Sequence, residues 1–479
     1  MNWSRLLVSC GVLAALSASP ESEAQSARET VDGASLGYMA VRVSDGGHYE
    51  VIDALNAESL FVPASVLKLV TVSAALEHLG ADYRWRTRLV AAGAFTDGVL
   101  DGDLVIQPGA DPTWGNAFFK GGAVEPLETL ATQIRASGLV RVKGDLVVDR
   151  RRFPGRSHPL DRAYGDLPYR HGTPTAAFAV DEATITVRVA PAQLVGEPAR
   201  VSAPEWVDVL NHTTTVGGAR HGAGTLDFVP VWGTETLLLR GEYPISEGPF
   251  VMAISDPMPE VRAARKLRVA LEEVGVVIEG VVRLGLPSDV PNGRGDILAE
   301  LSSRPLRDIL RRILWSSHNW YADMLALTLS KEVAGTGRFD DGVRVVSSFL
   351  EGLSADESTS PPRPWLRDGS GLSPANLVTP ISIVGLLGHA LERNWGGTLV
   401  AALAGPGEGT LAGWPSVPKI AAKTGTLRHT VGLAGFLDAG PEGPVIFCYF
   451  VNHLPGPPAV ARRQIATALT RWRSLGQSR

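Results

Sequence analysis

Ser65 and Lys68 form the first pair of side chains in this sequence that could do chemistry together. The segment Ser65-Val66-Leu67-Lys68 places a hydroxyl and an amine three residues apart, where the apolar pattern from Leu67 to Leu79 predicts a helix. Side chains with this spacing lie on one face of a helix, within contact range. A lysine removed from water can lose its proton and take one from a neighbouring hydroxyl. The pair therefore has the chemistry of a nucleophile and its base.

Lysine is scarce in this chain, so a lysine that is present is more often needed for what arginine cannot do. Only seven of the 45 basic residues are lysines, and arginine cannot act as a base at ordinary pH. A second Ser-x-x-Lys match, Ser416-Val417-Pro418-Lys419, contains a proline that breaks helical geometry. We therefore expect Ser65 with Lys68, and not Ser416, to be the reactive pair.

Two later segments carry further polar side chains. Ser317-His318-Asn319 lies at the beginning or in the middle of a helical stretch, and taken alone it is a polar turn or an exposed helix face. Lys423-Thr424-Gly425 lies in Ile420 to Gly435, which reads as a strand. Taken alone, Lys423 would be a solvated edge residue, but the glycine two positions later lets another backbone approach closely. This strand is therefore a candidate docking edge for an extended substrate.

The elements that must position these residues follow from hydrophobic periodicity. A hairpin is predicted near the N-terminus, and the chain ends as strand, turn, strand, strand and helix from Lys419 to Leu475. From about residue 87 to 290 the sequence changes to short β-rich segments with one helix, Met258 to Val274. The hairpin strands are predicted at Leu36–Ser44 and His48–Ala54, and the later helices at Pro305–Ser330, Val343–Leu353 and Pro380–Asn394.

Length and composition limit the class of protein. A chain of 479 residues favours two or three domains, and 44% hydrophobic with 20% charged residues indicates a folded chain. A net charge of -5 gives no reason to expect a nucleic-acid partner. Cys448, inside an apolar run, is predicted to be a buried and inert thiol.

The first 24 residues are predicted to be a secretory signal. Arg5 supplies a positive start, Leu6 to Ala18 is apolar, and Ser22-Glu23-Ala24 offers a small-x-small cleavage site. The apolar stretch is too short to span a bilayer comfortably. We therefore expect an exported protein of the periplasm or cell envelope, with at most peripheral membrane contact.

The three polar motifs, in this order, resemble the signature Ser-x-x-Lys, Ser-x-Asn and Lys-Thr-Gly of penicillin-binding proteins and serine β-lactamases. Further segments narrow the likeness to the class C low-molecular-mass penicillin-binding proteins, the D-Ala-D-Ala carboxypeptidase/endopeptidase family (peptidase family S13). These segments are Phe61-Val62-Pro63-Ala64-Ser65, Gly109-Ala110-Asp111-Pro112-Thr113, Asp368-Gly369-Ser370-Gly371-Leu372-Ser373 and Asn376-Leu377-Val378-Thr379-Pro380.

The resemblance implies an α/β (α+β) multi-domain fold. A penicillin-binding transpeptidase-like, or β-lactamase-like, catalytic domain would carry two nested β-rich inserted domains, for which the long interval between Ser65 and Ser317 leaves room. The expected boundaries are 25–86 and 292–479 for the catalytic domain, 87–108 and 180–291 for the first insertion, and 109–179 for the inner insertion.

The resemblance also implies roles for the polar residues. Ser65 would be acylated, with Lys68 as its base, and Ser317 with Lys423 would relay a proton to the leaving amine. Asn319 would hold the substrate amide. The implied substrates are peptidoglycan peptides that end in D-Ala-D-Ala or are cross-linked, and β-lactams would inhibit covalently.

Substrate binding would fall mainly to the strand that follows Lys423. Backbone N–H groups of Ser65 and Thr426 would form the oxyanion hole, a contribution of roughly 3 to 4 kcal/mol per donor in comparable sites. Thr424, next to Gly425, would help fix the terminal carboxylate. The sequence departs from the family pattern at His318, at His429 after Arg428, and at Pro374-Ala375. The last two concern recognition of the peptide's side chain.

Two other functions stay open. A serine β-lactamase would share the motifs, although the long interval between the first two argues against it. A catalytically silent envelope protein could use the insertions to bind glycan, although retention of the whole polar set argues against that. The ten histidines show no metal-ligand spacing, and Gly405 to Gly409 lacks the framing strand and helix of a phosphate loop, so no cofactor is expected.

Overall fold

A computed structural model describes residues 33–475 except 45–47, 116, 121, 219–224, 286–294, 354–360 and 441–442. The predicted signal at 1–24, the predicted hairpin turn at 45–47 and the expected boundary at 291/292 lie outside the described residues. The chain forms two compact units. The first unit comprises the described residues of Met1–Tyr83, Pro159–Asp161 and Pro305–Arg479, and the second unit those of Arg84–His158 and Arg162–Arg304. The expectation of a multi-domain chain that mixes helices and sheets is confirmed.

The first unit contains a five-stranded antiparallel sheet of order β16-β17-β18-β1-β2. The strands are β1 (Ser35–Val43), β2 (Tyr49–Leu55), β16 (Ile420–Leu427), β17 (Thr430–Leu437) and β18 (Val445–Asn452). Every residue of β17 and β18 is buried, which agrees with their nearly continuous apolar sequence. The predicted hairpin and C-terminal strands are therefore confirmed.

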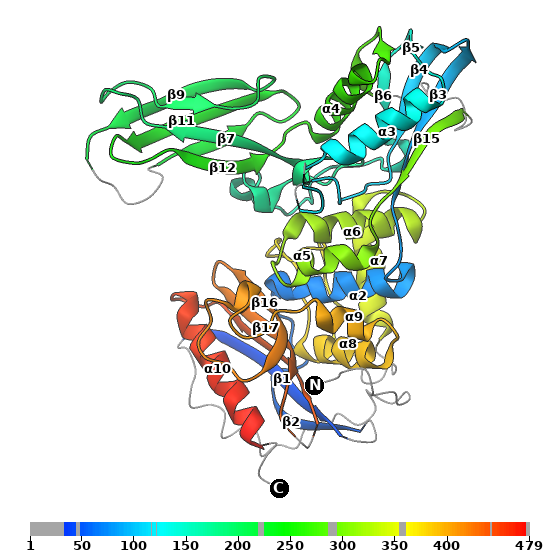
Figure 1. The fold of residues 1–479 in the computed structure, drawn as a ribbon. Coiled ribbons are helices and arrows are strands. Elements are labelled where there is room, and N and C mark those ends of the chain that lie inside the picture. Colours follow the sequence, from blue (N-terminus) through cyan, green and yellow to red (C-terminus); the bar gives the residue numbers. More distant parts are fainter. Residues whose placement is uncertain are drawn as a thin grey trace. The chain divides into compact units, whose positions relative to one another are not determined.

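Helices cover both faces of this sheet. The C-terminal helix α10 (Pro458–Leu475) lies along the sheet (Figure 1). Its Trp472 packs beside Tyr38 and Phe447. Helix α8 (Pro380–Glu392) contacts β1 and β18. Between them, Cys448 lies in the middle of β18 with no exposed surface, and burial raises the pKa of its thiol well above the usual range. The predicted buried thiol is confirmed.

The other helices of the first unit lie beside the sheet (Figure 1). Every residue from Lys68 to Leu76 is buried, so α2 is a central helix and not a surface one. The predicted helix Pro305–Ser330 is broken at residues 315–318, where Ser317 has a φ of 59°. The elements are η3 (Ala64–Leu67), α2 (Lys68–Leu79), η9 (Leu306–Ile309), α5 (Leu310–Leu314), α6 (Asn319–Glu332), α7 (Phe339–Gly352), α9 (Gly396–Ala401) and η10 (Gly409–Leu411).

The described residues of the second unit form two large hydrophobic cores. One core lies between a mixed sheet and two helices, α3 (Val124–Ala136) and α4 (Pro259–Glu273). The sheet has the order β13-β5-β4-β3-β15, with β6 and β14 attached. Its strands are β3 (Arg86–Thr96), β4 (Val99–Gln107), β5 (Arg141–Val142), β6 (Leu146–Val148), β13 (Val277–Ile278), β14 (Val282–Leu284) and β15 (Asp296–Ser302).

The second core lies between two three-stranded sheets, β10-β11-β9 and β12-β7-β8. The strands are β7 (Thr184–Ala190), β8 (Arg200–Ser202), β9 (Asp208–Val216), β10 (Asp227–Pro230), β11 (Thr236–Pro244) and β12 (Phe250–Ser255). Short 3-10 turns connect the two parts: η4 (Arg150–Arg152), η5 (Tyr164–Asp166), η6 (Arg170–Gly172) and η7 (Asp181–Ala183).

One core of the second unit combines residues of both expected insertions. Leu127, Leu130 and Ile134, from the expected inner insertion 109–179, pack in one core with Leu89 and Leu267. The core that is separate belongs to residues 185–254. The reason is that α3, a helix absent from the sequence-based expectation, buries its apolar face against the sheet that holds β3 and β4. The separate core therefore lies between β7 and β12, and the expected boundaries at 109 and 179 stay a prediction.

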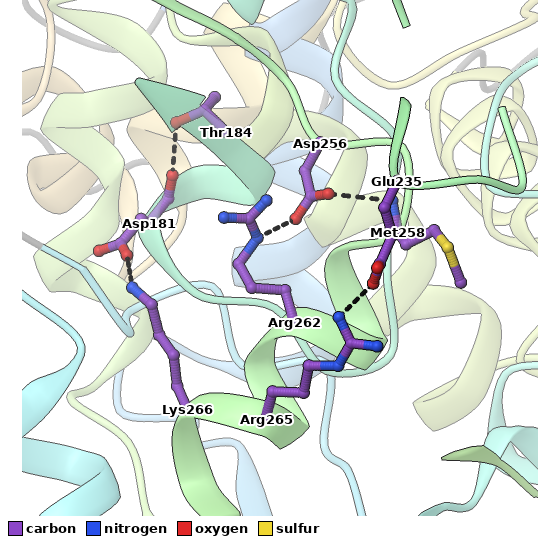
Figure 2. Close-up of polar contacts among 8 residues, drawn as sticks. All are labelled: Asp181, Thr184, Glu235, Asp256, Met258, Arg262, Arg265 and Lys266. Atoms are coloured by element: carbon purple, nitrogen blue, oxygen red, sulfur yellow. Dashed lines mark hydrogen bonds and ion pairs between the residues drawn. The ribbon is translucent and has the colours of Figure 1, made fainter. Parts of the chain in front are cut away.

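Charged side chains on α4 join the two cores within the second unit (Figure 2). Arg262 is 7% exposed, donates from Nε to Asp256, and lies 3.5 Å from the ring centroid of Trp206. Lys266 pairs with Asp181 at 2.7 Å, and Arg265 pairs with Glu235. Burial raises the pKa of Asp256 and lowers the pKa of Arg262 to about 10, while their mutual attraction opposes both shifts.

Candidate active site

Ser65 and Lys68 meet in the short helical turn that leads into α2. Lys68 Nζ donates to Ser65 Oγ at 2.7 Å. The turn is tight, since Ala64 has a φ of 47° and η3 is a 3-10 helix that ends where Lys68 begins α2. The Lys68 side chain is fully buried, whereas Ser65 is partly exposed. The hydroxyl is thus partly exposed while its amine partner is withdrawn from solvent, and the two are in contact, as their spacing predicts.

Lys68 is also held by two segments that are distant in sequence. Its Nζ donates to Asn319 Oδ1 at 2.8 Å and to the Ser370 carbonyl oxygen at 2.6 Å. Asn319 is the first residue of α6. The amine therefore has three oxygen neighbours, which fix its position relative to Ser65 Oγ.

The loop that contains Ser370 is organised by one buried carboxylate. Asp368 accepts hydrogen bonds from the backbone N–H of Gly371 and of Ser373, both at 2.8 Å, and from Asn376 Nδ2 at 2.8 Å. Gly371 has a φ of 78°, and a Cβ there would lie 1.9 Å from the Ala64 carbonyl oxygen. Only glycine fits this contact, so the loop rests directly against the turn that carries Ser65.

Lys423 and Ser317 form a second amine and hydroxyl pair. Lys423 Nζ donates to Ser317 Oγ at 2.9 Å and to the Thr424 carbonyl oxygen at 2.8 Å. Lys423 is fully buried on β16. Burial lowers the pKa of Lys423 well below its usual range, and the nearby charge of Lys68 lowers it further. Ser317 is placed by the break between α5 and α6, where its φ of 59° turns the chain.

Strand β16 presents the edge of the sheet beside Ser65. It is the first strand in the order β16-β17-β18-β1-β2, so one side of it is unpaired within the sheet. A Cβ on Gly425 would lie 2.6 Å from the Pro63 carbonyl oxygen and 3.3 Å from Ser65 N. The glycine therefore allows the Ser65 amide to approach β16 closely at Gly425. The next residue along the strand, Thr426, is exposed. The predicted docking edge lies where an extended chain could meet Ser65.

The structure thus brings Ser65, Lys68, Ser317, Asn319 and Lys423 together, with Thr424, Gly425 and Thr426 on the adjoining strand. Sequence reasoning missed the Ser370 carbonyl as a partner of Lys68 and Asp368 as the organiser of its loop. The motif around Asp368 carries part of the family resemblance, but its hydrogen bonds depend on backbone geometry that a sequence does not display.

The three departures from the family pattern have structural positions of their own. His318 is the residue before α6, and its ring lies 4.8 Å from that of Tyr321. His429, in the turn between β16 and β17, has a φ of 62°, and its Nδ1 lies 2.8 Å from the Leu454 carbonyl oxygen. Pro374 and Ala375 lie in the loop that Asp368 organises. These contacts hold the local backbone and are separate from the hydrogen bonds that hold the two lysines.

A pocket of about 560 Å³ lies elsewhere in the first unit. It is lined by Asp340, Val343 and Arg344 of α7 and by Trp365 and Arg367, among others, and not by Ser65 or Lys423. The reactive side chains belong to the hydrogen-bonded polar cluster and not to this pocket. Within the described residues we find no group of three or more metal-ligating side chains, and no helix both long and apolar enough to cross a membrane.

Comparison with known proteins gives consistent matches over nearly the whole chain. Residues 21–474 match the model of the D-Ala-D-Ala carboxypeptidase 3 (S13) family. A D-alanyl-D-alanine carboxypeptidase of Actinomadura sp. (strain R39) is 33% identical over 92% of this chain and 82% of the relative. The crystal structure of penicillin binding protein 4 (dacB) from Haemophilus influenzae is 25% identical, with a TM-score of 0.77 over 89% of this chain and 92% of that one. A second structure of that protein, complexed with a novel β-lactam, has a TM-score of 0.72 at 24% identity over the same shares.

Proposed function

This chain belongs to the D-Ala-D-Ala carboxypeptidase 3 (S13) family, and on that premise we propose that it cleaves peptidoglycan stem peptides through an acyl-enzyme at Ser65. It is a serine hydrolase with a penicillin-binding, β-lactamase-like fold. The observation that carries the proposal is the contact of 2.7 Å between Lys68 Nζ and Ser65 Oγ, with a second buried lysine close by.

The first step is acylation. Lys68 acts here in its neutral form, after its ammonium has lost a proton. Ser65 Oγ attacks the carbonyl carbon of the penultimate D-Ala while Lys68 Nζ takes its proton, and the peptide C–N bond breaks. The leaving amine receives a proton from the Ser317 hydroxyl, which Lys423 resupplies. Because burial lowers the pKa of Lys423, its ammonium gives up a proton more readily than a solvated lysine would.

The substrate is held along β16. Its carbonyl oxygen points between the backbone N–H groups of Ser65 and Thr426, which stabilise the negative charge that develops on it. Asn319 contacts the substrate amide, and Thr424 contacts the terminal carboxylate beside Lys423. The close approach at Gly425 supports this arrangement because it brings the Ser65 amide next to the strand.

A water molecule then attacks the Ser65 ester and releases the shortened peptide. Lys68 Nζ returns its proton to Ser65 Oγ, and the proton that the water loses restores the Lys423 ammonium. When the leaving amine is free D-Ala the reaction is that of a carboxypeptidase, and when it is the side chain of a cross-linked peptide the reaction is that of an endopeptidase. We propose both, because the same bond chemistry serves either leaving group. A β-lactam would acylate Ser65 in the same way and remain attached.

We further propose that the chain is exported to the periplasm or cell envelope by the signal at residues 1–24, since its proposed substrates lie there. The mass of the mature protein from the culture or the periplasm would locate the cleavage. A protein that keeps residues 1–24 and stays inside the cell would contradict export without affecting the proposed chemistry.

The proposed function is tested by mixing the protein with a fluorescent penicillin, measuring its intact mass and mapping the modified peptide. We expect one adduct, on Ser65, and none in Ser65→Ala, with the melting curve unchanged. An adduct on Ser416, or persistent labelling of Ser65→Ala, would refute the mechanism. A β-lactamase would instead release the hydrolysed drug rapidly, and a silent binding protein would form no adduct.

A further inference from the structure

Thr410 connects two parts of the active site that are distant in sequence. It lies in η10, and its Oγ1 is 2.6 Å from Oγ1 of Thr424, the residue after the buried Lys423. Its backbone N–H donates to the Trp315 carbonyl oxygen at 3.2 Å, two residues before Ser317. One residue thus touches both β16 and the turn that carries Ser317.

The segment around Thr410 is closely fitted, so this contact is built into the fold. Gly409 has a φ of 46°, and a Cβ there would lie 2.4 Å from the Trp315 carbonyl oxygen. Upstream, Ala404 and Ala422 exchange backbone hydrogen bonds, which ties the start of this segment to β16. Backbone contacts at Ala404 and at Gly409 therefore hold the Thr410 side chain against Thr424. Thr410 itself is partly exposed.

Thr424 and Thr426 share one face of β16, because side chains two apart in a strand point the same way. Thr426 is exposed, so this face reaches solvent, while the Ser65 amide approaches the opposite face of the strand at Gly425. Thr424 itself is 5% exposed, and its hydroxyl is turned toward Thr410.

We propose that Thr410 is a positioning residue that orients the Thr424 hydroxyl toward the terminal carboxylate of the substrate. This inference rests on the proposed function. It identifies the part of the site that distinguishes a substrate with a free terminal carboxylate from one with a terminal amide. A hydroxyl has one hydrogen to donate and can accept two, whereas an ionised carboxylate only accepts. In the structure Thr424 Oγ1 donates to Thr410 Oγ1. When a carboxylate is bound, Thr424 must donate to it instead, so the hydrogen bond between the two threonines reverses and runs from Thr410 to Thr424.

Such a chain of two hydroxyls strengthens the donor at its end, because each hydrogen bond polarises the next. Without the Thr410 hydroxyl, the Thr424 hydroxyl loses this hydrogen-bond partner. It can then rotate more freely when the substrate carboxylate binds. The effect is specific for a charged acceptor, since hydrogen bonds to ionised groups are about twice as strong as those between neutral groups.

The test compares Thr410→Val, which keeps the shape of the side chain and removes the hydroxyl, with Thr410→Ser, which restores the hydroxyl. Each variant is assayed on a peptide that ends in D-Ala-D-Ala with a free carboxylate and on the same peptide with a terminal amide. Thr467→Val is the matched control, because Thr467 makes a hydroxyl to carbonyl hydrogen bond on the exposed surface of α10.

We expect Thr410→Val to lower kcat/KM for the free acid about tenfold, mainly through KM, and to change kcat/KM for the amide less than about twofold. Thr410→Ser should recover most of the preference for the free acid, and Thr467→Val should match the wild type on both peptides.

Equal losses on both peptides, or no loss on either, would overturn the inference, as would a failure of Thr410→Ser to recover the preference in a variant with an unchanged melting curve. The proposed function fails separately: it is refuted when the wild-type protein forms no adduct on Ser65, whatever Thr410→Val does.

Discussion

Two buried cations, Lys423 in the first unit and Arg262 in the second, are held in opposite ways. Lys423 donates to a hydroxyl and a carbonyl oxygen, and the charge of Lys68 adds to the lowering of its pKa. Arg262 is paired with Asp256 and stacked on Trp206, and the carboxylate works against the lowering of its pKa, which is about 10.

The difference shows how the surroundings of a buried charge decide its use. A guanidinium with a pKa of about 10 stays charged at neutral pH, so Arg262 can only fasten α4 to Trp206 and Asp256. An amine withdrawn from water without such compensation is prepared to exchange its proton. The surroundings of Arg262 stabilise the fold, whereas those of Lys423 favour proton transfer. Substitutions at the two sites can test this difference.

The largest effect is expected for Lys68→Arg. An arginine keeps the positive charge but cannot accept the proton of Ser65, so acylation by penicillin should fall about 10⁴-fold, as for the loss of a member of other catalytic sets. The measurement is the acylation rate at Ser65, with the melting curve as a check on folding. If acylation stayed within a few-fold of wild type, Lys68 would be an anchor and not a base.

Removing the carboxylate of the structural pair should act on stability and not on chemistry. Asp256→Ala leaves the buried Arg262 charge without its counter-ion and should destabilise the second unit by about 3 to 5 kcal/mol. Amide hydrogen exchange along α4 measures this, and the acylation rate at Ser65 should not change. The double variant Asp256→Ala, Arg262→Met should lose less, because no unpaired charge remains. A larger loss in the double variant would show that packing on Trp206 dominates.

Lys423→Met is expected to stabilise the fold while it abolishes turnover. A pKa lowered below the ordinary value of 10.5 means that the unfolded state binds more protons, so the native protein is weakened at every pH below that value. Methionine removes this penalty, and we expect a gain of about 1 to 2 kcal/mol at neutral pH. The gain should shrink as the pH rises toward 10.5. A gain independent of pH would point to packing instead of charge.

The smallest effect is expected at an exposed ion pair. Arg240 and Asp227 on β11 and β10 are 2.8 Å apart, with 60% and 43% of their side chains exposed. Solvent screens such a pair, so Asp227→Ala should change the free energy of unfolding by less than about 1 kcal/mol. Amide hydrogen exchange measures the change, and the loss in Asp256→Ala is the value with which it is compared. Equal losses for the two variants would remove the distinction between buried and exposed pairs.

Much of the first unit could be predicted from the sequence, and the reasons are local. Strands β1, β2 and β16 to β18 follow runs of apolar residues, and the Ser65 and Lys68 pair needs only a helical turn to meet. The sequence left the break at residues 315–318 undecided between a polar turn and an exposed helix face, because apolar residues continue on both sides of it. Only tertiary contacts, such as that between Lys423 and Ser317, impose it.

The second unit is harder to predict, because its division depends on which surfaces bury each other. The helix α3 has its buried residues Leu127, Leu130 and Ile134 at helical spacing, and a proline lies in its first turn. This helix is absent from the sequence-based expectation, and only tertiary packing shows that its apolar face joins the core of β3 and β4. The contact of Thr410 with Thr424 likewise joins residues 14 apart across a turn, which no periodicity describes.

The position of Cys448 allows the opening of the central sheet to be measured by alkylation of its thiol. The sequence contains two cysteines, Cys10 in the predicted signal and Cys448 in β18, between β17 and β1. With no exposed surface and a raised pKa, this thiol can meet an alkylating reagent only when the central sheet of the first unit opens. Alkylation would therefore time the opening of the sheet that supports Ser65, without any introduced label. The second unit has no cysteine, so its own opening would leave the signal unchanged.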